Sequence, residues 1–191
     1  METPTRVLSI DIGIVSYSFC IVDFQENEFE LVHIEKVAIG TVKQTAHLLA
    51  KAAVDFLRSS EAINEKPISY VYIENQMSRA VKNTILAYST MTYFYTEALI
   101  SQSDVHIRFV PPRVKFQAVD AYFPGVVESQ HTICKTASKD LKKLSVKIAR
   151  RVFTELNVSK GLEALAKYKP KLDDVSDVFL QSFAVFLDKY R

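Results

Sequence analysis

The first 24 residues constrain the fold more than any other part of the chain. Two apolar runs, residues 6–12 and 16–24, lie almost back to back with Gly13 between them. Glycine adopts backbone angles that other residues avoid, so two such runs around it predict a hairpin of buried strands. Asp11 lies inside the first run, where a carboxylate costs free energy unless a cation, a metal ion or a backbone N–H compensates it.

The rest of the chain extends this hairpin into a mixed sheet. Residues 29–39 predict a third strand and complete an antiparallel meander, and residues 68–74 and 105–110 predict two more strands. Apolar residues at helical spacing predict helices over residues 42–59, 78–101, 138–156 and 173–189. Residues 118–135 read as irregular, and residues 157–172 as a polar connection. We therefore expect a single α/β domain over residues 1–191, with a mixed five-stranded sheet flanked by helices and the first strand in its middle.

Length and composition exclude several classes of protein. A chain of 191 residues with 48% hydrophobic residues can bury one substantial core. No apolar run reaches the roughly 18 residues of a membrane span, and the first residues lack the pattern of a signal peptide. Cys20 and Cys134 form neither a disulfide framework nor a zinc motif. These features predict an intracellular protein without a membrane partner.

The charge of the chain is unevenly distributed. Residues 112–171 contain 13 basic and 5 acidic residues, a net charge of +8, whereas the whole chain carries only +2. A basic region of this kind favours an anionic partner, with nucleic acid as the leading candidate, or forms a solvated lysine-rich helix.

Acidic residues follow two of the predicted strands and open the last predicted helix. Asp11 lies near the end of the first strand and Glu74 ends the fourth, which are positions where catalytic groups recur in α/β sheets. Asp174 and Asp177 are three residues apart and so share one helix face. Each acid also has a structural interpretation: Asp11 in a turn with Gly13, Glu74 at an exposed strand end, and Asp173 or Asp174 as a helix cap.

Together these carboxylates predict a site for divalent metal. Several carboxylates in one cleft repel each other, and a cation removes that repulsion. Oxygen ligands suit Mg²⁺ or Mn²⁺. Two such ions about 3.5–4 Å apart can activate water and stabilise the leaving oxygen in phosphodiester cleavage.

The three stretches LSIDIGIVSYSFCIVD, YVYIENQ and KLDDVSDVFLQ resemble the RuvC-like branch of the ribonuclease H superfamily, and the poxvirus Holliday junction resolvases in particular. The resemblance covers essentially the whole chain. It implies a ribonuclease H-like fold and an endodeoxyribonuclease that resolves Holliday junctions and related branched DNA by paired nicks. It also implies viral genome concatemer processing in the host cytoplasm.

The same resemblance assigns roles to residues of this chain. Asp11, Glu74, Asp174 and Asp177 match the catalytic, metal-holding acids, with two Mg²⁺ or Mn²⁺ ions per site and no small-molecule cofactor; Asp173 is taken as a cap. It implies a homodimer, with the helix after the fourth strand at the interface through the stripe Val81, Ile85, Tyr88, Met91, Tyr95 and Leu99; an apolar stripe of this kind is also typical of ordinary core.

Side chains near these motifs are candidates for contacting DNA. Phosphate contacts by basic residues would make binding strongly salt-dependent. The candidates are Asn75, Gln76, Arg79, Lys82, Arg113, Lys115, Lys135, Lys139, Lys142, Lys143 and Lys147.

Three other functions compete with a junction nuclease. An actin- or hexokinase-like ATPase shares the sheet, but it needs glycine-rich phosphate loops, and the four glycines of this chain are far apart. A DNA-binding module without catalysis gains nothing from acids that face phosphates. A ribonuclease H acting on RNA–DNA hybrids would use the same metal chemistry, so it stays open as the alternative.

Overall fold

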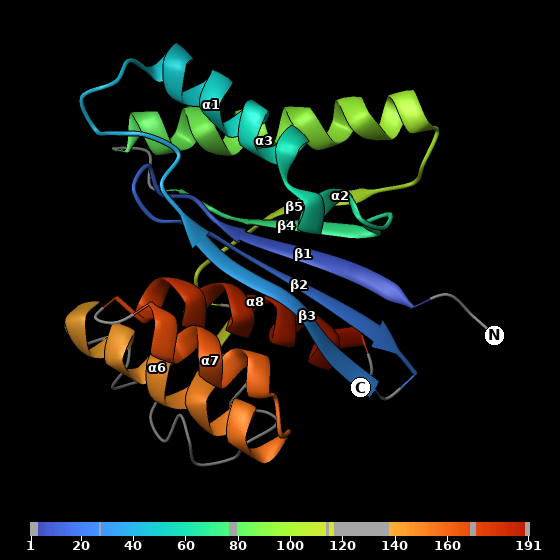
Figure 1. Cartoon of the computed structure of the whole chain (residues 1–191), viewed down its shortest axis with the longest axis vertical. Helices are drawn as coiled ribbons and strands as arrows, with labels where there is room; N and C mark the ends of the chain where they lie inside the picture. Colours follow the sequence, from blue (N-terminus) through green and yellow to red (C-terminus); the bar gives the residue numbers. More distant parts are fainter. Residues whose placement is uncertain are drawn as a thin grey trace.

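The computed structural model describes residues 4–26, 28–76, 80–113, 115–116, 138–168 and 171–189, with side chains for all of these except 138–141, 188 and 189. Figure 1 shows three layers, in which one sheet lies between two layers of helices. Among the described residues, no helix is both long enough and apolar enough to cross a bilayer.

The sheet contains five strands in the order β3-β2-β1-β4-β5. The strands are β1 (Thr5–Asp11), β2 (Tyr17–Gln25), β3 (Glu28–Val37), β4 (Tyr70–Glu74) and β5 (His106–Val110). The first three pair antiparallel, whereas β4 runs parallel to β1 and β5 runs parallel to β4. The predicted mixed sheet with its central first strand is thus confirmed. Because β1 and β4 are parallel, their last residues, Asp11 and Glu74, lie at the same edge of the sheet.

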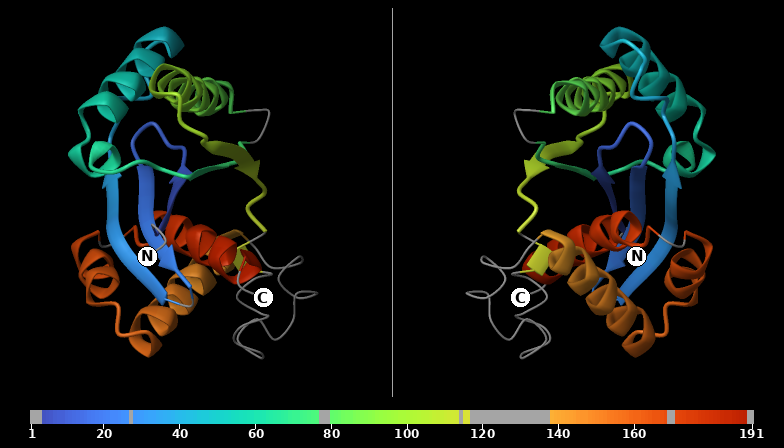
Figure 2. Two further views of the ribbon diagram at one scale, coloured as in Figure 1. Left: turned by 90° about the vertical axis from the view of Figure 1, so that its right-hand side faces the viewer. Right: turned by 90° about the vertical axis from the view of Figure 1, so that its left-hand side faces the viewer.

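The helices cover the two faces of the sheet separately (Figures 1 and 2). One face carries α1 (Ala46–Ser59), α2 (Glu61–Asn64) and α3 (Val81–Ser101). The other carries α6 (Ser138–Glu155), α7 (Ser159–Lys167) and α8 (Asp173–Lys189), with α8 packed on β1, β2 and β3. Two hydrophobic cores result, one on each face of the sheet. Their buried side chains alternate along β1: Val7 faces α8, whereas Leu8 and Ile10 face α1 and α3.

Two predicted segments were wrong. The first helix begins at Ala46 rather than residue 42. The connection expected after residue 156 contains α7, which begins after Asn157 turns the chain with a φ of 54°. The buried face of α7 consists of Gly161, Ala164 and Leu165, so it gives little hydrophobic signal in the sequence. Gly161 is required there, since an added Cβ would lie 2.3 Å from the ring of Phe153.

Two other predictions cannot be compared with the structure. The irregular segment 118–135 and a start of the second long helix at Ser78 fall outside the described residues.

Most of the apolar stripe of α3 points to solvent, whereas Ile85 and Met91 are half-buried. Val81, Tyr88, Tyr95 and Leu99 are 62%, 54%, 46% and 81% exposed. The buried face of α3 is instead made by Leu86, Ala87, Thr90, Tyr93 and Phe94. The interpretation of the stripe as ordinary core therefore holds for Met91, which packs against a core, but not for the four exposed residues, because tertiary packing uses mainly a different face of this helix.

A buried ion pair fixes the end of β1 opposite Asp11. Arg6 on β1 and Asp23 on β2 are cross-strand partners, and the guanidinium donates two hydrogen bonds of 2.7 and 2.8 Å to the carboxylate. Their side chains are only 4% and 10% exposed. This bidentate geometry pairs the two opposite charges within the protein, although Arg6 Nη1 is buried and makes no hydrogen bond with the described residues.

Candidate active site

Three elements bring acidic side chains to one place. Asp11 is the last residue of β1, Glu74 is the last residue of β4, and α8 begins beside them with Asp173. On the opposite face of α8, Val175, Val178 and Phe179 are fully buried against the sheet. This packing holds the first turn of α8, and with it Asp174 and Asp177, over the edge where β1 and β4 end.

The carboxylates of Asp11, Glu74 and Asp177 form the tightest group. One oxygen atom of each lies within 4.8 Å of the others, and among the described residues no other acidic, histidine or cysteine group meets this geometry. All three side chains are half-buried. Glu74 Oε2 and Asp177 Oδ1 are buried and accept no hydrogen bond from any residue that the structure describes. Such oxygens carry a desolvation cost that a bound cation would offset.

The electrostatics of Asp11 and Glu74 favour their protonation when no cation is bound. Burial raises the pKa of Asp11 well above its ordinary value, and the negative charges of Glu74, Asp177 and Asp174 raise it further against the opposing charge of Lys115. Burial also raises the pKa of Glu74, with Lys115 opposing and Asp177 adding to the shift. The protein therefore concentrates more negative charge here than it neutralises.

Lys115 is the cation closest to the triad. Its Nζ lies 2.8 Å from Asp177 Oδ2 and 3.5 Å from Glu74 Oε2, and its side chain is only 6% exposed. Burial lowers the pKa of this ammonium, but Asp177 and Glu74 outweigh burial, so the net shift is upward and Lys115 stays charged. One lysine among three carboxylates leaves the group negative.

The two acids that open α8 have separate lysine partners. Asp174 Oδ2 accepts a hydrogen bond of 2.5 Å from Lys36 Nζ on β3, and Asp173 pairs with Lys142 on α6. Burial raises the pKa of Asp173, but the hydrogen bonds from Lys142 and from its own backbone N–H outweigh it, so the pKa lies below the ordinary value. Asp173 is the first residue of the helix and thus lies one position after a cap, so the predicted capping role stays a prediction. Asp174 faces the triad without belonging to its tightest group.

The donor set fits a divalent cation. Carboxylate oxygens are the ligands that Mg²⁺ and Mn²⁺ prefer, and two of the oxygens here are buried without a hydrogen bond from the described residues. Asp11, Glu74 and Asp177 would hold such an ion at the described geometry, and Asp174 is close enough to influence the charge of Asp11. The arrangement can therefore place cations against a bound phosphate group.

The residues expected to contact DNA divide into several groups. Lys143 and Lys147 are exposed on α6 near Lys142, and Arg113 is exposed in the turn after β5. Lys82 donates instead to the carbonyl oxygens of Val42 and Gln44, at 2.6 and 2.8 Å. Arg79, Lys135 and the side chain of Lys139 lie outside the described part of the chain.

Asn75 and Gln76 follow Glu74 directly and line the edge of the site. The backbone N–H of Asn75 donates to Val110 O at 2.8 Å, and the side-chain amide of Gln76 donates to Glu74 O at 3.3 Å. Asn83 on α3 donates to both Gln76 Oε1 and Ile12 O, at 3.4 and 3.3 Å. Asn83 thus links the segments that follow Asp11 and Glu74, a role that the sequence did not indicate.

Lys36 is the main residue of the site that sequence reasoning missed. In the sheet register Asp11 pairs with Ser18, and Ser18 pairs with Lys36, so these three residues form one row on the face that α8 covers. Counting this register in the predicted meander could have placed Lys36 beside Asp11. No sequence signal marked the bulge between Ile21 and Val22. It shifts the pairing of β2 with β3 by one residue, but only in the part of the two strands away from Asp11.

The chain matches no protein-family model and no curated protein. Its fold does match solved structures. The yeast mitochondrial Holliday junction resolvase Ydc2 aligns with a TM-score of 0.67 at 14% identity, over 98% of this chain and 83% of that one. The fowlpox virus Holliday junction resolvase aligns with 0.64 at 19% identity, over 96% and 99%.

A bacterial structure matches over a similar length. RuvC of Thermus thermophilus, solved with a Holliday junction substrate, aligns with a TM-score of 0.61 at 15% identity, over 97% of this chain and 95% of that one. The mixed five-stranded sheet and its two helical layers are thus the fold of the RuvC-like, ribonuclease H-like resolvases.

Proposed function

We propose that this protein is a divalent-metal-dependent endodeoxyribonuclease that resolves four-way and related branched DNA junctions by paired nicks. The observation that carries the proposal is the Asp11, Glu74 and Asp177 triad at the shared end of β1 and β4, where two buried oxygens accept no hydrogen bond from the described residues. Its support is the fold, which matches junction resolvases from a yeast, a virus and a bacterium over nearly the whole chain.

The chain's own residues supply the framework for phosphodiester hydrolysis. Asp11, Glu74 and Asp177 hold Mg²⁺ or Mn²⁺, and Asp174 completes the set of acids. When bound, two such ions supply an activated water and a countercharge for the leaving oxygen. Lys115 neutralises part of the carboxylate charge from within the site. Packing of α8 against the sheet keeps the acids in register with each other.

The exposed lysines of α6 suit the DNA backbone. Lys142, Lys143 and Lys147 are exposed on a helix whose partner α8 carries the acids. Phosphate contacts from this surface would orient DNA without reading its sequence. We expect DNA binding to weaken steeply as the salt concentration rises, because each contacted phosphate releases about one counterion.

Paired nicks require two active sites, and we propose that a second copy of the chain docks on α3. The outward face of this helix shows residues at alternating intervals of four and three. Val81, Tyr88, Thr92, Tyr95 and Leu99 are exposed and Ile85 is half-buried, with Thr92 in place of Met91, which packs against the core. That 3.5-residue period is the spacing of a helix that pairs with another helix. The stripe carries no charge, so a copy related by a two-fold axis could meet the same stripe without repulsion.

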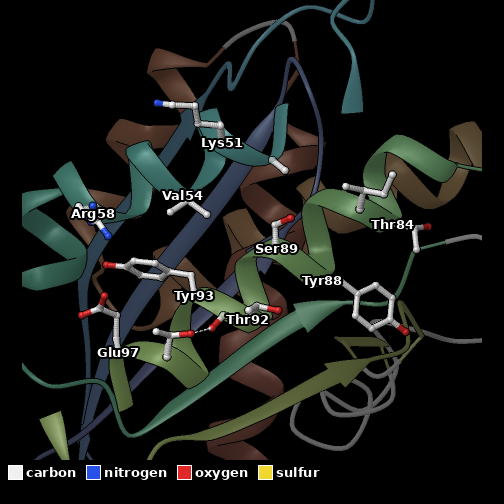
Figure 3. A pocket seen from close by; sticks show the side chains of 12 residues that line it. Lys51, Val54, Arg58, Thr84, Tyr88, Ser89, Thr92, Tyr93 and Glu97 are labelled. Carbon is white, nitrogen blue, oxygen red and sulfur yellow. Dashed lines mark hydrogen bonds between the residues drawn. The ribbon is translucent and has the colours of Figure 1, made fainter. Parts of the chain in front are cut away.

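A groove beside the stripe offers room for the partner. It has a volume of 630 Å³ and lies between α1 and α3, with Val54, Ile85 and Tyr88 among its apolar walls. Figure 3 shows Tyr88, Ser89 and Thr92 of α3 opposite Lys51, Val54 and Arg58 of α1. Tyr88 reaches from the stripe toward β5, where its ring lies 5.3 Å from that of Phe109.

Cleavage assays test the catalytic proposal. The protein is incubated with a fixed four-way junction, a linear duplex and an RNA–DNA hybrid, each with Mg²⁺, Mn²⁺ or EDTA. We expect symmetrical cutting of the junction with metal and none in EDTA. Equal cutting of the junction and the linear duplex would contradict junction selectivity, and preferential cutting of the hybrid would identify the ribonuclease H alternative.

Substitution of the acidic residues tests the assignment of the site. Glu74→Gln and Asp174→Asn should retain the fold and lose cleavage, because each removes a charge from the acidic cluster. Glu163→Gln on α7 is the matched control, since it changes the same charge far from the cluster. Full activity of Glu74→Gln would refute the assignment of the triad.

The oligomeric state tests the α3 interface. Tyr95→Glu places a charge in the second half of the stripe and should convert a dimer into a monomer in sedimentation experiments. Leu162→Glu, a change of an exposed apolar residue on α7, should leave the dimer intact. A wild-type protein that sediments as a monomer at assay concentration, yet still makes paired cuts, would contradict this part of the proposal.

The biological setting is also part of the proposal. The resemblance to the fowlpox virus enzyme supports resolution of concatemeric viral genomes in the host cytoplasm. Localisation of the tagged protein to cytoplasmic sites of viral DNA synthesis would agree with it, and accumulation elsewhere in infected cells would not.

A further inference from the structure

The pair between Lys36 and Asp174 links the edge strand of the meander to the start of α8. The two side chains are 13% and 15% exposed, and Lys36 Nζ also lies 3.5 Å from Lys171 O. A charged pair that is this well buried is held firmly, because breaking it would leave a charge without compensation. Lys36 thus fixes where the carboxylate of Asp174 points.

That direction sets Asp174 apart from the triad. Asp11, Glu74 and Asp177 have oxygens within 4.8 Å of each other, and Asp174 is absent from this group although its charge still acts on Asp11. Lys36 occupies the same sheet row as Asp11, two strands away. The ammonium therefore holds the fourth carboxylate on the β3 side of the site.

We propose that Lys36 is a positioning residue that keeps Asp174 out of the metal-binding triad until a divalent cation competes for it. Lys36 and the cation bind the same carboxylate, so each weakens the other. In the protein without DNA, the first cation is held by three carboxylates, and the fourth joins only when Lys36 releases it. This inference rests on the proposed metal-dependent function of the triad.

Lys142 provides a matched comparison. It also pairs with an acid at the start of α8, Asp173, and its charge also acts on the neighbouring carboxylates. Its side chain is 59% exposed, however, and it does not contact Asp174. Removing Lys142 therefore removes one positive charge near the site but leaves the Lys36–Asp174 pair intact.

Titration of the full chain with Mn²⁺ alone, without DNA, tests the proposal by calorimetry. We expect Lys36→Met to bind Mn²⁺ about fivefold or more tightly than wild type, because Asp174 becomes available. Lys142→Met should change the affinity less than about twofold, and Lys36→Arg should behave like wild type. In an Asp174→Asn background, Lys36→Met should have no further effect, since the carboxylate it controls is gone.

Each other result has a defined meaning. An equal gain for Lys36→Met in the Asp174→Asn background, or an equal gain for Lys142→Met, would show a general charge effect and overturn the proposal. An unchanged affinity of Lys36→Met, with a normal circular dichroism spectrum, would overturn it as well. If Lys36→Met fails to fold, the Mn²⁺ affinities of Asp174→Asn and Lys36→Arg test the proposal instead. A fivefold weaker first-site affinity in Asp174→Asn would show that Asp174 already binds and would refute the proposal.

The controls separate this inference from the proposed function. Asp11→Asn should abolish Mn²⁺ binding if the triad holds the metal. If Asp11→Asn has no effect, or wild type binds no Mn²⁺, the proposed function and this inference both fail. If Asp11→Asn abolishes binding while Lys36→Met leaves it unchanged, only the role of Lys36 fails.

Discussion

The two ends of β1 each bring a charged side chain into the protein, and they do so with opposite results. At one end, Arg6 is bound in a bidentate pair with Asp23, so the two opposite charges compensate each other, although Arg6 Nη1 makes no hydrogen bond with the described residues. At the other end, Asp11 faces Glu74 and Asp177, and Lys115 pairs with Glu74 and Asp177. An ion pair whose charges compensate each other stabilises the hairpin. A cluster of uncompensated carboxylates is destabilised by repulsion, which a bound cation can remove. The difference distinguishes a structural charge from a functional one within seven residues of one strand.

The largest effect is expected at the end of β1 with the uncompensated carboxylates. Asp11→Asn should reduce junction cleavage by about 10⁴-fold, about 5 kcal/mol of transition-state stabilisation, because the triad loses one of its three ligands. The measurement is the single-turnover rate with Mg²⁺ on a fixed junction. Asp23→Asn is the matched substitution at the other end. It should leave the rate per folded molecule within a few-fold of wild type, and an equal loss in both variants would erase the distinction.

The next largest effect is on stability, at the end of β1 with the compensated ion pair. Arg6→Met should destabilise the protein by about 3 to 5 kcal/mol, because Asp23 is left buried without its partner. Chemical denaturation followed by circular dichroism measures the change. The exposed pair of Lys51 and Asp55 on α1 gives the comparison, since Lys51→Met should cost less than about 1 kcal/mol. A loss below that value for Arg6→Met would mean that the buried pair contributes no more than a surface pair.

A smaller effect of opposite sign is expected for Asp11 itself. In the presence of a chelator near pH 8, Asp11→Asn should be more stable than wild type by about 1 to 2 kcal/mol, because one negative charge leaves the cluster. The raised pKa of Asp11 means that the folded wild-type protein binds a proton more readily than the unfolded chain does.

The pH dependence of that effect follows from its sign. The penalty of the charged carboxylate is absent below the unfolded pKa and grows as pH rises through the higher folded pKa. The advantage of Asp11→Asn should therefore shrink as the pH falls toward about 4. Unfolding curves at several pH values in EDTA measure it, and an advantage that grows at low pH would contradict the described cluster.

The smallest effect concerns the metal. Mn²⁺ at about five times its dissociation constant should stabilise the wild-type protein by about 1 kcal/mol, through binding to the folded state alone. Asp11→Asn should show no such gain, whereas Asp23→Asn should show a gain similar to wild type. Thermal unfolding with and without Mn²⁺ measures it, and stabilisation of Asp11→Asn would place the metal elsewhere.

Most of the fold could be predicted because each strand and helix carries its own pattern. The five strands and the four long helices follow from apolar runs, alternation and helical spacing in the sequence. The prediction was wrong where packing replaced the local signal. The helix α7 buries glycine and alanine, and α3 turns a less obvious face to the core than its apolar stripe.

The same division applies to the candidate site. Asp11 and Glu74 could be chosen from the sequence because each ends a strand at a position where a bare carboxylate is costly. Asp177 could be chosen because it lies three residues after Asp174 on the same helix face. Lys115 could be noticed only as a basic residue near the motifs. Its burial between Asp177 and Glu74 depends on how the segment after β5 returns to the sheet, and no local pattern records this.

The sequence by itself determined the strands and the long helices of this protein and which of its acids are out of place, because both follow from the periodicity and chemistry of near neighbours. Only the tertiary structure decided the partner of each charge. Lys36 is 138 residues from Asp174, and Arg6 is 17 residues from Asp23. Such pairs depend on strand register and helix packing, which place distant side chains within hydrogen-bonding distance.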